Sequence, residues 1–511
     1  MKPSIPHRSP WQTSTPAALF KPFEGELSAD VCIVGAGIAG LLCALELTER
    51  GYSVVVLERE SLAAGDTGAT TAHLTAMLDT RYYALASMHG AEAARSVAAS
   101  HTLAISYLER LANVYEIDCD FQRVSGFLCA ADDAQASTLE RERKAASDAG
   151  ISCELVNRAP LPITRGRALH LPRQAQFDPT RFLRGVAEAL LRKGARLHAP
   201  VSVESVDAKD QSERVTVRSS DGRIVRAKSV VVATGSPIND VATIHTKQAA
   251  YRSYAVAVDM PDTTPALHWD MNDPYHYVRS AKDGTTGRQV LIAGGEDHRV
   301  GQDSDNQARF ERLEDWLRER IPEAGVIVSQ WSGQVFEPAD GLAFIGRNPG
   351  QERVFVVTGE SGNGMTYSAI AAPLIADLVQ GIENPLEKIY DPSRKPSSLS
   401  ALGHFVQENL NTAAQYTDWV APAEVARLED IEPGQGAVLR RGLRRLAVYV
   451  DDAGAVHQLS ATCPHLGGVV TWNPAEKSWD CPCHGSRFDC YGKVLVGPAV
   501  QDLKRVDAET A

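Results

Sequence analysis

The stretch Asp30-Val-Cys-Ile-Val-Gly-Ala-Gly-Ile-Ala-Gly40 specifies the architecture of most of this chain. Its first part, residues 30–34, is a short and mainly apolar run, which predicts a buried strand. Three glycines follow at the spacing G-x-G-x-x-G, and the apolar residues that continue through Leu47 predict a helix. A strand, a glycine-rich turn and a helix in this order predict an α/β fold around a parallel sheet.

The surroundings of the three glycines give the pattern a specific meaning. Gly35 permits the turn, Gly37 lets the backbone approach a pyrophosphate, and Gly40 lets the helix pack on the strand. A second strand, Ser53–Leu57, ends in Glu58, an acid 18 residues after the last glycine. This arrangement predicts a dinucleotide site in which Glu58 accepts hydrogen bonds from the adenosine ribose. An ordinary βαβ turn without a ligand is the alternative.

Two further segments favour FAD over NAD by resemblance. Ser229–Gly235 resembles the strand and Ala-Thr-Gly element that closes over FAD in flavoproteins of the glutathione-reductase type. Val354–Val357 and the glycine-rich loop after it resemble the last strand, loop and helix of the D-amino-acid-oxidase-like (DAO) superfamily. In that superfamily the helix N-terminus faces the flavin pyrimidine and stabilises the negative charge of reduced flavin. A glycine-rich connector is the alternative.

The loop Gly65–Thr71 resembles the small-residue loop beside the flavin in the same superfamily. In its dimethylglycine- and sarcosine-dehydrogenase relatives, a histidine of this loop bonds covalently to the flavin. The matching position here is Ala69, so we expect non-covalent FAD, with His73 packed nearby. In an expected strand over Arg196–Val206, Val203 is the expected backbone partner of adenine. Together these segments imply FAD contacts by Gly35, Gly37, Gly40, Glu58, Arg59, Thr67, Thr70, Thr71, Val203, Thr234, Gly235, Gly359, Gly362, Gly364, Met365 and Thr366.

A second motif near the C-terminus offers two pairs of metal ligands. Cys463-Pro-His465 is followed, after fifteen residues, by Cys481-Pro-Cys-His484. Each pair supplies one thiolate and one imidazole, the mixture that holds a [2Fe–2S] cluster with two cysteines on one iron and two histidines on the other. Neutral imidazoles lower the negative charge around such a cluster and raise its potential. A structural zinc ion bound by the same four side chains is the alternative.

The string around these ligands resembles the Rieske ferredoxin family. The resemblance implies Cys463 and Cys481 on one iron, and His465 and His484 on the other. It also implies a C-terminal all-β domain that carries the cluster at its tip.

This sequence departs from the respiratory Rieske pattern at two places. Gly468 stands where respiratory members carry a cysteine that forms a disulfide with the residue matching Cys483. Phe488 stands where high-potential members carry a tyrosine that donates to a ligand sulfur, whereas the other usual donor, Ser486, is retained. Fewer donors predict a potential below that of the respiratory centres. Whether Cys483 and Cys490 are free thiols stays open from the sequence.

Composition narrows the class of protein. The 511 residues carry a net charge of −12, which argues against nucleic acid or an anionic membrane as the main partner. We expect no membrane span, because no run of 18 apolar residues occurs. The N-terminal residues lack an apolar export region, and the nine cysteines lack disulfide spacing. We therefore expect a bacterial cytoplasmic protein with reduced thiols.

The expected fold class is an α/β FAD-binding domain of the glutathione-reductase/DAO-type Rossmann fold, with an antiparallel-sheet substrate domain and a C-terminal all-β Rieske domain. The expected division is an N-terminal extension over 1–29, an FAD-binding domain over 30–90, 176–239 and 336–390, a substrate domain over 91–175 and 240–335, a linker over 391–422, and a Rieske domain over 423–511.

Residues for substrate chemistry are sought on the expected strands of the substrate domain. Arg252, Tyr254, Tyr277 and His298 are the candidates. In DAO-type sites an arginine or tyrosine often holds a substrate carboxylate, and the paired donors of arginine suit that contact. Cross-strand pairs and surface charges are the alternative.

The resemblance covers nearly the whole chain and implies a DAO-family flavoprotein fused to a Rieske domain. It implies oxidation of a small-molecule amine or amino acid by FAD, with electrons passed to the cluster and on to an unknown acceptor. A tethered acceptor competes with oxygen and so favours a dehydrogenase. Two alternatives are an NAD(P)H-dependent reductase, which needs a second nucleotide-binding unit that we do not find, and a non-catalytic redox sensor.

Overall fold

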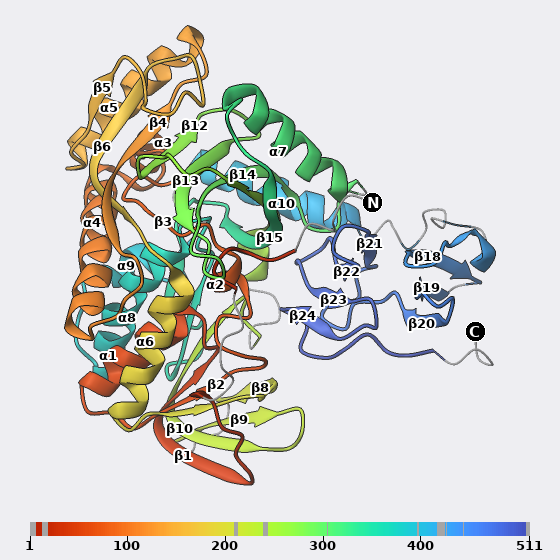
Figure 1. Cartoon of the computed structure of the whole chain (residues 1–511). Helices are drawn as coiled ribbons and strands as arrows, with labels where there is room; N and C mark the ends of the chain where they lie inside the picture. Colours follow the sequence, from red (N-terminus) through yellow and green to blue (C-terminus); the bar gives the residue numbers. More distant parts are fainter. Residues whose placement is uncertain are drawn as a thin grey trace.

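The computed structural model describes residues 7–12, 19–208, 213–238, 244–303, 305–395, 398–415, 419, 425, 427–442 and 444–506. Figure 1 shows a large body built on two sheets, with a smaller all-β part, drawn in blue, at its side. Parts of the expected N-terminal extension, linker and Rieske domain lie outside the described residues, namely 1–6, 13–18, 396–397, 416–418, 420–424, 426, 443 and 507–511.

The first sheet is the parallel sheet that the glycine pattern predicts. Its strands are β1 (Glu26–Val34), β2 (Val54–Leu57), β7 (Arg196–His198), β8 (Val203–Asp207), β9 (Val215–Ser219), β10 (Ile224–Gly235), β16 (Phe344–Arg347) and β17 (Val354–Thr358). The order is β16-β17-β10-β1-β2-β7, and neighbours in it run parallel except β16 and β17. β9 and β8 extend β10 as an antiparallel ribbon. The edge at the carboxyl ends of β1, β2 and β10 is where such sheets bind dinucleotides.

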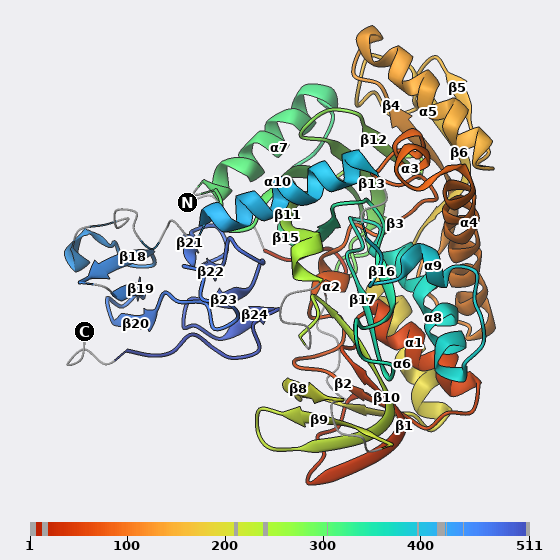
Figure 2. The same ribbon diagram turned by 180° about the vertical axis from the view of Figure 1, so that it is seen from behind.

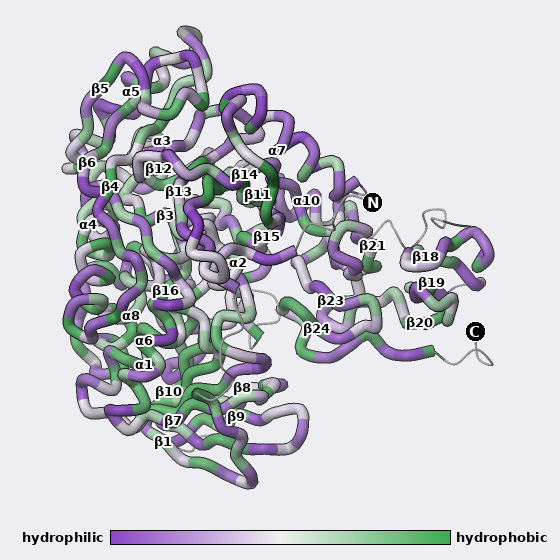
Figure 3. Tube along the Cα trace, in the orientation of Figure 1, coloured by the Kyte–Doolittle hydropathy of each residue, from purple (hydrophilic) through white to green (hydrophobic). Residues whose placement is uncertain are grey.

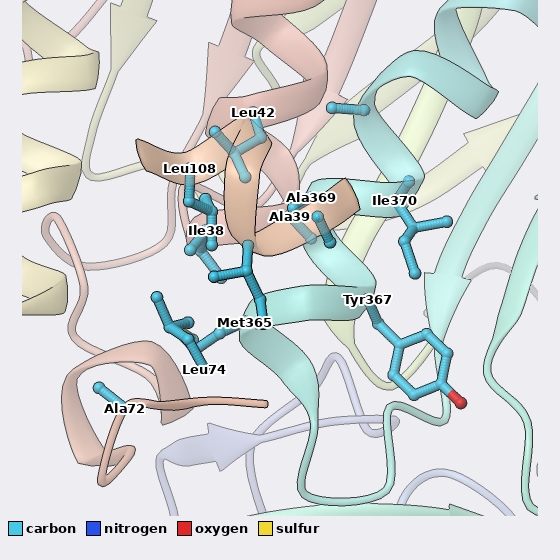
Figure 4. Close-up of a cluster of buried hydrophobic side chains, with 14 of the residues drawn as sticks. Ile38, Ala39, Leu42, Ala72, Leu74, Leu108, Met365, Tyr367, Ala369 and Ile370 are labelled. Carbon is cyan, nitrogen blue, oxygen red and sulfur yellow. The ribbon is translucent and has the colours of Figure 1, made fainter. Parts of the chain in front are cut away.

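Helices cover one face of this sheet and the β8–β9 ribbon covers the other. The helices are α1 (Ile38–Glu49), α4 (Ala91–Val114), α6 (Pro179–Arg192) and α8 (Gly364–Gln380). Figure 4 shows Ile38 and Leu42 of α1 packed with Leu108 of α4 and with Met365 and Ile370 of α8. Figure 3 shows hydrophobic segments concentrated in these helices and in the strands beneath them. No helix among the described residues is long and apolar enough to cross a membrane.

The second sheet is mostly antiparallel, as expected for a substrate domain. Its strands are β3 (His73–Leu74), β4 (Gln122–Cys129), β5 (Glu154–Val156), β6 (Ala168–Gln176), β11 (Gln248–Asp259), β12 (Ala266–Asp270), β13 (His276–Lys282), β14 (Gln289–Arg299) and β15 (Ile327–Pro338). The order is β15-β11-β14-β13-β12-β4-β6-β3, with β5 beside β6, and only β12 and β4 run parallel. Helix α7 (Asn306–Arg320) packs on β11 and β14, while α3 (Tyr82–His89) and α5 (Ala136–Asp148) pack together farther along.

Two elements cross the boundaries expected from the sequence. Helix α4 falls in the segment assigned to the substrate domain, but it packs against α8 in the helical layer of the parallel sheet. Strand β3 falls in the segment assigned to the FAD-binding domain, but it pairs with β6 in the second sheet. Both differences arise because apolar surfaces and strand edges find partners far along the chain, which a division into segments does not capture.

The smaller part consists of two short antiparallel sheets. One contains β18 (Gly436–Arg441), β19 (Arg444–Val450) and β20 (Val456–Ser460). The other contains β21 (Thr471–Asn473), β22 (Ser478–Asp480), β23 (Arg487–Asp489) and β24 (Val494–Val496), and it lies nearer to the large body. Helix α10 (Leu399–Gln415) runs beside α7 and leads toward this part, as Figure 2 shows from behind.

The start of α6 provides a test of one local contact. The Asp178 carboxylate accepts hydrogen bonds from the backbone N–H groups of Thr180 and Arg181, at 2.9 and 3.0 Å. We predict that Asp178→Ala lowers the free energy of unfolding by about 1 kcal/mol, because these donors lose their acceptor. Asp178→Asn keeps an acceptor and serves as the control, with a much smaller effect. Urea unfolding followed by fluorescence measures both, and equal losses would contradict the capping role.

Candidate functional site

A cavity of about 910 Å³ extends from the carboxyl ends of the parallel strands to the second sheet. All the expected FAD-binding residues line it except Gly40 and Thr366. The cavity also contacts β24 and the turn between β21 and β22, so the small part forms a section of its wall.

The glycines of the first turn leave room for a ligand and for close packing. A Cβ atom on Gly35 would lie 2.4 Å from the carbonyl oxygen of Ala233, and its φ of +104° favours glycine. A Cβ atom on Gly40 would lie 2.0 Å from the carbonyl oxygen of Gly35. Gly40 therefore lets α1 approach β1 and does not line the cavity.

A glutamate and an arginine that follow β2 line the cavity. Glu58 accepts hydrogen bonds from the backbone N–H groups of Ala36 and Glu60, at 2.8 and 2.9 Å. Burial raises the pKa of its carboxyl. The next residue, Arg59, donates to the backbone carbonyl of Leu495 on β24. The end of the cavity at which the sequence predicts adenosine is therefore formed by both parts of the chain.

The N-terminus of α8 forms the opposite end of the expected FAD site. Gly359, Gly362, Gly364 and Met365 line the cavity, and the positive end of the helix dipole lies there. Thr366 does not reach it, because its hydroxyl is 2.9 Å from Nδ1 of His101 on α4. The cradle left by the glycines, the acid at the end of β2 and this helix N-terminus together fit FAD.

The small-residue loop supplies no covalent link at the expected position. Ala69 lines the cavity, and its carbonyl accepts a hydrogen bond from the Trp331 indole at 2.8 Å. His73 also lines the cavity, where its Nδ1 lies 3.2 Å from the Thr71 hydroxyl and its ring meets the edge of Tyr277. Burial lowers the pKa of His73 to about 3, so its imidazole is neutral.

The four expected cluster ligands come together as two pairs. The thiols of Cys463 and Cys481 lie within hydrogen-bonding distance of each other, and the rings of His465 and His484 are 5.0 Å apart. Among the described residues, no three His, Cys, Asp or Glu side chains converge to hold one metal ion. A pair of cysteines and a pair of histidines suit a [2Fe–2S] cluster with one pair on each iron.

Hydrogen-bond donors surround the two sulfurs. The backbone N–H of His465 and the hydroxyl of Ser486 lie beside the Cys463 sulfur, and the backbone N–H of Cys483 lies beside the Cys481 sulfur. The Ser486 oxygen accepts from the backbone N–H of Ala499 at 3.0 Å, which leaves its proton for the sulfur.

The structure also shows where the disulfide of respiratory Rieske proteins would lie. None of the nine cysteines, all of which lie among the described residues, forms a disulfide bond. A Cβ atom on Gly468 would lie 2.5 Å from the Cys483 sulfur, so these two positions are neighbours in space. The disulfide is absent because residue 468 has no side chain, and the two loops otherwise keep the proximity that the respiratory pattern implies.

The cluster loops pack directly on strands that line the FAD cavity. The side-chain amide of Gln334 on β15 donates to the backbone carbonyl of Gly485 at 2.8 Å. A Cβ atom on Gly485 would lie 2.3 Å from the Cβ of Ala250 on β11. The ring of His245 lies 4.9 Å from that of His465 and 6.0 Å from that of His484. The imidazole edge of the cluster site thus faces the flavoprotein body.

Two of the four catalytic candidates reach the cavity. The Tyr277 hydroxyl lines it and lies 3.0 Å from the Ser253 hydroxyl. Arg252 also lines it, but its guanidinium forms an ion pair with Glu476 of the small part at 2.5 Å. One terminal nitrogen of Arg252 is engaged by Glu476, whereas its buried Nε has no hydrogen-bond partner among the described residues. A role for Arg252 in holding a substrate carboxylate stays a prediction.

Tyr254 and His298 lie on the other face of the second sheet, which corrects their assignment as substrate residues. Both contact the side chain of Asn306 on α7, at 2.9 and 2.6 Å. Side chains alternate along a strand, so Ser253, which lines the cavity, puts Tyr254 on the opposite side. Alternation separates Ser253 from Tyr254, but it does not say from the sequence which of the two faces the cavity.

The Ser486 hydroxyl beside the Cys463 sulfur yields a prediction for the midpoint potential of the cluster. Ser486→Ala removes a hydrogen bond that stabilises the reduced, more negative cluster, so the midpoint potential falls. A net hydrogen bond of about 0.5–1.5 kcal/mol corresponds to roughly 20–65 mV for one electron. Redox titration followed by EPR measures the shift. Ser486→Thr, which keeps the hydroxyl, is the control, and an unchanged potential in the alanine variant would refute the contact.

Two family models match the sequence. The model of the FAD dependent oxidoreductase (DAO) family matches residues 30–378, and that of the Rieske [2Fe-2S] domain matches residues 421–507. The first match alone covers more than half of the chain.

Curated relatives show the same two-part organisation or one part of it. YhfW of Bacillus subtilis (strain 168), named as a Rieske 2Fe-2S iron-sulfur protein, is 31% identical over 98% of this chain and 97% of its own length. Gamma-glutamylputrescine oxidoreductase of Escherichia coli (strain K12) is 24% identical over 71% of this chain and 86% of its own.

Solved structures share the fold of the large body. L-proline dehydrogenase from P. horikoshii superposes with a TM-score of 0.60 at 18% identity, over 73% of this chain and 98% of that one. Glycine oxidase from Geobacillus kaustophilus superposes with a TM-score of 0.59 at 20% identity, over 72% of this chain and 99% of that one. The chain belongs to the DAO family of FAD dependent oxidoreductases and carries a C-terminal Rieske [2Fe-2S] domain.

Proposed function

We propose that this protein is an FAD-dependent amine dehydrogenase that passes electrons through its Rieske cluster to a separate acceptor. The observation that carries the proposal is the contact between the two sites. Gln334 both lines the FAD cavity and holds the loop that contains His484, through the carbonyl of Gly485. Positioning of one redox centre against another is the contribution that a protein makes to such chemistry.

Bound FAD would accept the hydride from the carbon next to the amine nitrogen while the nitrogen loses a proton, which leaves an imine, and the cluster would accept electrons singly. The chain provides the setting for this reaction. The N-terminus of α8 favours negative charge on the ring that it faces. Ser253, Tyr275 and Tyr277 line the end of the cavity at the second sheet, where a substrate has room to bind.

A buried chain of charges holds the Rieske domain in place. Glu476 contacts Arg252 of β11 at 2.5 Å and Arg487 of β23 at 2.6 Å, and Arg487 also contacts Asp480 at 2.9 Å. Burial alone would raise the pKa of Glu476, but the two arginines hold it at about 2. Glu476 is therefore ionised at neutral pH. Separation of the domains would leave buried charges unmatched, which is strongly unfavourable.

Several observations support amine oxidation over the alternatives. The names of the relatives, a gamma-glutamylputrescine oxidoreductase, a glycine oxidase and an L-proline dehydrogenase, all describe chemistry on carbon–nitrogen bonds. An NAD(P)H-dependent reductase needs a second parallel nucleotide-binding sheet, and the described residues contain one such sheet. Nine cysteines without a disulfide bond among the described residues support the bacterial cytoplasm as the compartment.

The release of flavin on denaturation tests how FAD is held. Ala69, at the position expected for a covalent link, has no nucleophilic side chain, so we predict release of the flavin on acid denaturation. Precipitation of the purified protein with acid, followed by absorbance of the supernatant, measures this. Yellow flavin in the supernatant is the expected result, and flavin that remains with the pellet would contradict non-covalent binding.

A variant that lacks one cluster ligand tests whether the flavin is reduced before the cluster. His484→Ala removes a cluster ligand, so anaerobic bleaching of the flavin by substrate should persist while reduction of a one-electron acceptor falls to background. The screen uses a library of amines and amino acids beside NADH and NADPH. His457→Ala, a histidine of the same domain outside the cluster, is the control and keeps both activities. Bleaching by NADH, or loss of bleaching in the folded His484→Ala protein, would overturn the proposal.

A further inference from the structure

Residues 68–72, at the end of the small-residue loop, have each backbone carbonyl hydrogen-bonded by a side chain. In chain order the acceptors are the carbonyls of Gly68, Ala69, Thr70, Thr71 and Ala72, and their donors are the side chains of Ser9, Trp331, Trp11 and, for the last two, Arg279. The donors come from residues 7–12 and from β15 and β13. Side chains from three distant segments thus fix the backbone of this stretch.

This stretch lies along the FAD cavity. Upstream of it, the Thr67 hydroxyl oxygen accepts a hydrogen bond from the backbone N–H of Ile38 at the start of α1, at 3.2 Å. Downstream of it, β3 contacts α8. Ala69, Thr70 and Thr71 line the cavity in between. The start of α1 is the position for a pyrophosphate, so we expect a bound FAD to extend its flavin along these residues.

Arg279 is a buried cation that lacks an ion-pair partner among the described residues. Only 3% of the residue is exposed. The acceptors of its guanidinium are the backbone carbonyls of Thr71, Ala72, Phe177 and Ser280, at 3.0, 2.7, 3.3 and 3.0 Å. Buried charges in proteins are usually paired, so this arginine needs a source of negative charge beyond these carbonyls.

Two carboxylates act on Arg279 from beyond ion-pairing distance, and both are engaged elsewhere. They belong to Asp178, which caps α6, and to Asp120, which pairs with Lys282 at 3.1 Å. Burial lowers the pKa of Arg279 to about 9, so the guanidinium is charged at neutral pH. A negative charge on a ligand in the cavity would help to balance it.

A short chain of hydrogen bonds connects this charge to the cavity. One terminal nitrogen of Arg279 donates to the carbonyl of Thr71 at 3.0 Å. The N–H of the same peptide group, on Ala72, donates to the Thr70 hydroxyl oxygen at 3.0 Å. A hydroxyl that accepts a hydrogen bond keeps its own proton to donate, and hydrogen bonds in a chain polarise one another. Arg279 therefore strengthens Thr70 as a donor toward the cavity that it lines.

We propose that Arg279 is a positioning residue that stabilises negative charge on the bound flavin, through the peptide group between Thr71 and Ala72 and the hydroxyl of Thr70. Two electrons and one proton added to FAD leave one negative charge on its ring, and the buried guanidinium balances that charge. Arg279 thereby raises the midpoint potential of the flavin. The role is independent of which substrate delivers the electrons, so it goes beyond the proposed function.

Two pairs of variants of the holoenzyme test the chain of contacts. Arg279→Gln removes the charge and keeps a donor, whereas Arg279→Lys keeps the charge. Thr70→Val removes the hydroxyl at nearly constant volume, whereas Thr70→Ser keeps it. An anaerobic titration against a reference dye measures the midpoint potential of the flavin. We expect a lower potential in Arg279→Gln and Thr70→Val than in the wild type, and recovery of most of the loss in Arg279→Lys and Thr70→Ser.

Sulfite provides a second readout without turnover. Its sulfur lone pair forms a bond to N5 of oxidised flavin, no bond breaks, and the ring becomes negative. Bleaching of the visible flavin band then gives the dissociation constant. We expect weaker sulfite binding by roughly ten-fold or more in Arg279→Gln, from the lost charge. For Thr70→Val we expect a loss of roughly two- to ten-fold, from one hydrogen bond.

Arg123→Gln is the matched control. Arg123 also donates to a backbone carbonyl, that of Arg173 at 2.9 Å, and it does not line the cavity. Its substitution leaves the potential and the sulfite affinity unchanged. Retained FAD and an unchanged far-ultraviolet spectrum show that a variant is folded, and if Arg279→Gln loses FAD, the Thr70 pair decides. An unchanged potential in Thr70→Val, or equal potentials in Thr70→Val and Thr70→Ser, would overturn the inference. So would a folded Arg279→Gln protein with the wild-type potential.

Discussion

Glu476 fixes the relationship on which the two redox sites depend. It projects from the turn between β21 and β22 and lies between Arg252 of the flavoprotein body and Arg487 of its own domain. Charges taken out of water need partners in good geometry, so the docked arrangement is the one that satisfies all of them. The same contact closes the cavity wall and sets the cluster loops against β11 and β15. A single carboxylate thereby couples the shape of the FAD site to the position of the cluster.

The cluster loops rely on this docking in place of a covalent link. In the respiratory pattern a disulfide ties the two loops together, and here Gly468 leaves Cys483 without a disulfide bond. Hydrogen bonds hold the loops instead, from Trp419 to the carbonyl of Gly467 at 3.0 Å and from Gln334 to the carbonyl of Gly485 at 2.8 Å. One support comes from the chain that joins the domains and the other from the flavoprotein body. The cluster site is therefore built by the fusion and not by the Rieske domain alone.

Local patterns predicted the two halves, because the spacing of a few residues determines each of them. The glycine turn, the acid after β2 and the cysteine–histidine pairs lie within short segments. The contacts between the halves could not be predicted in this way. Arg252 and Glu476 are 224 residues apart, and Gln334 and Gly485 are 151 apart. No periodicity records such pairings, which arise only when both surfaces are folded.

The prediction of Tyr254 and His298 as substrate residues did not match the structure for a different reason. Residue type alone suggested Tyr254 and His298, but the face of a strand decides what a side chain can reach. A register irregularity in the pairing of β11 with β14, between Arg252 and Tyr254, also disturbs the simple alternation there.

The contact between Arg59 and Leu495 has a consequence for how the protein is assembled. It joins the adenosine end of the cavity to β24, and residues 494–497 form part of the same wall. The C-terminal domain thus completes a wall that the dinucleotide fold by itself leaves unfinished. Synthesis from the N-terminus produces the dinucleotide fold long before this domain. The part of the chain that is made last therefore supplies the final side of the cavity.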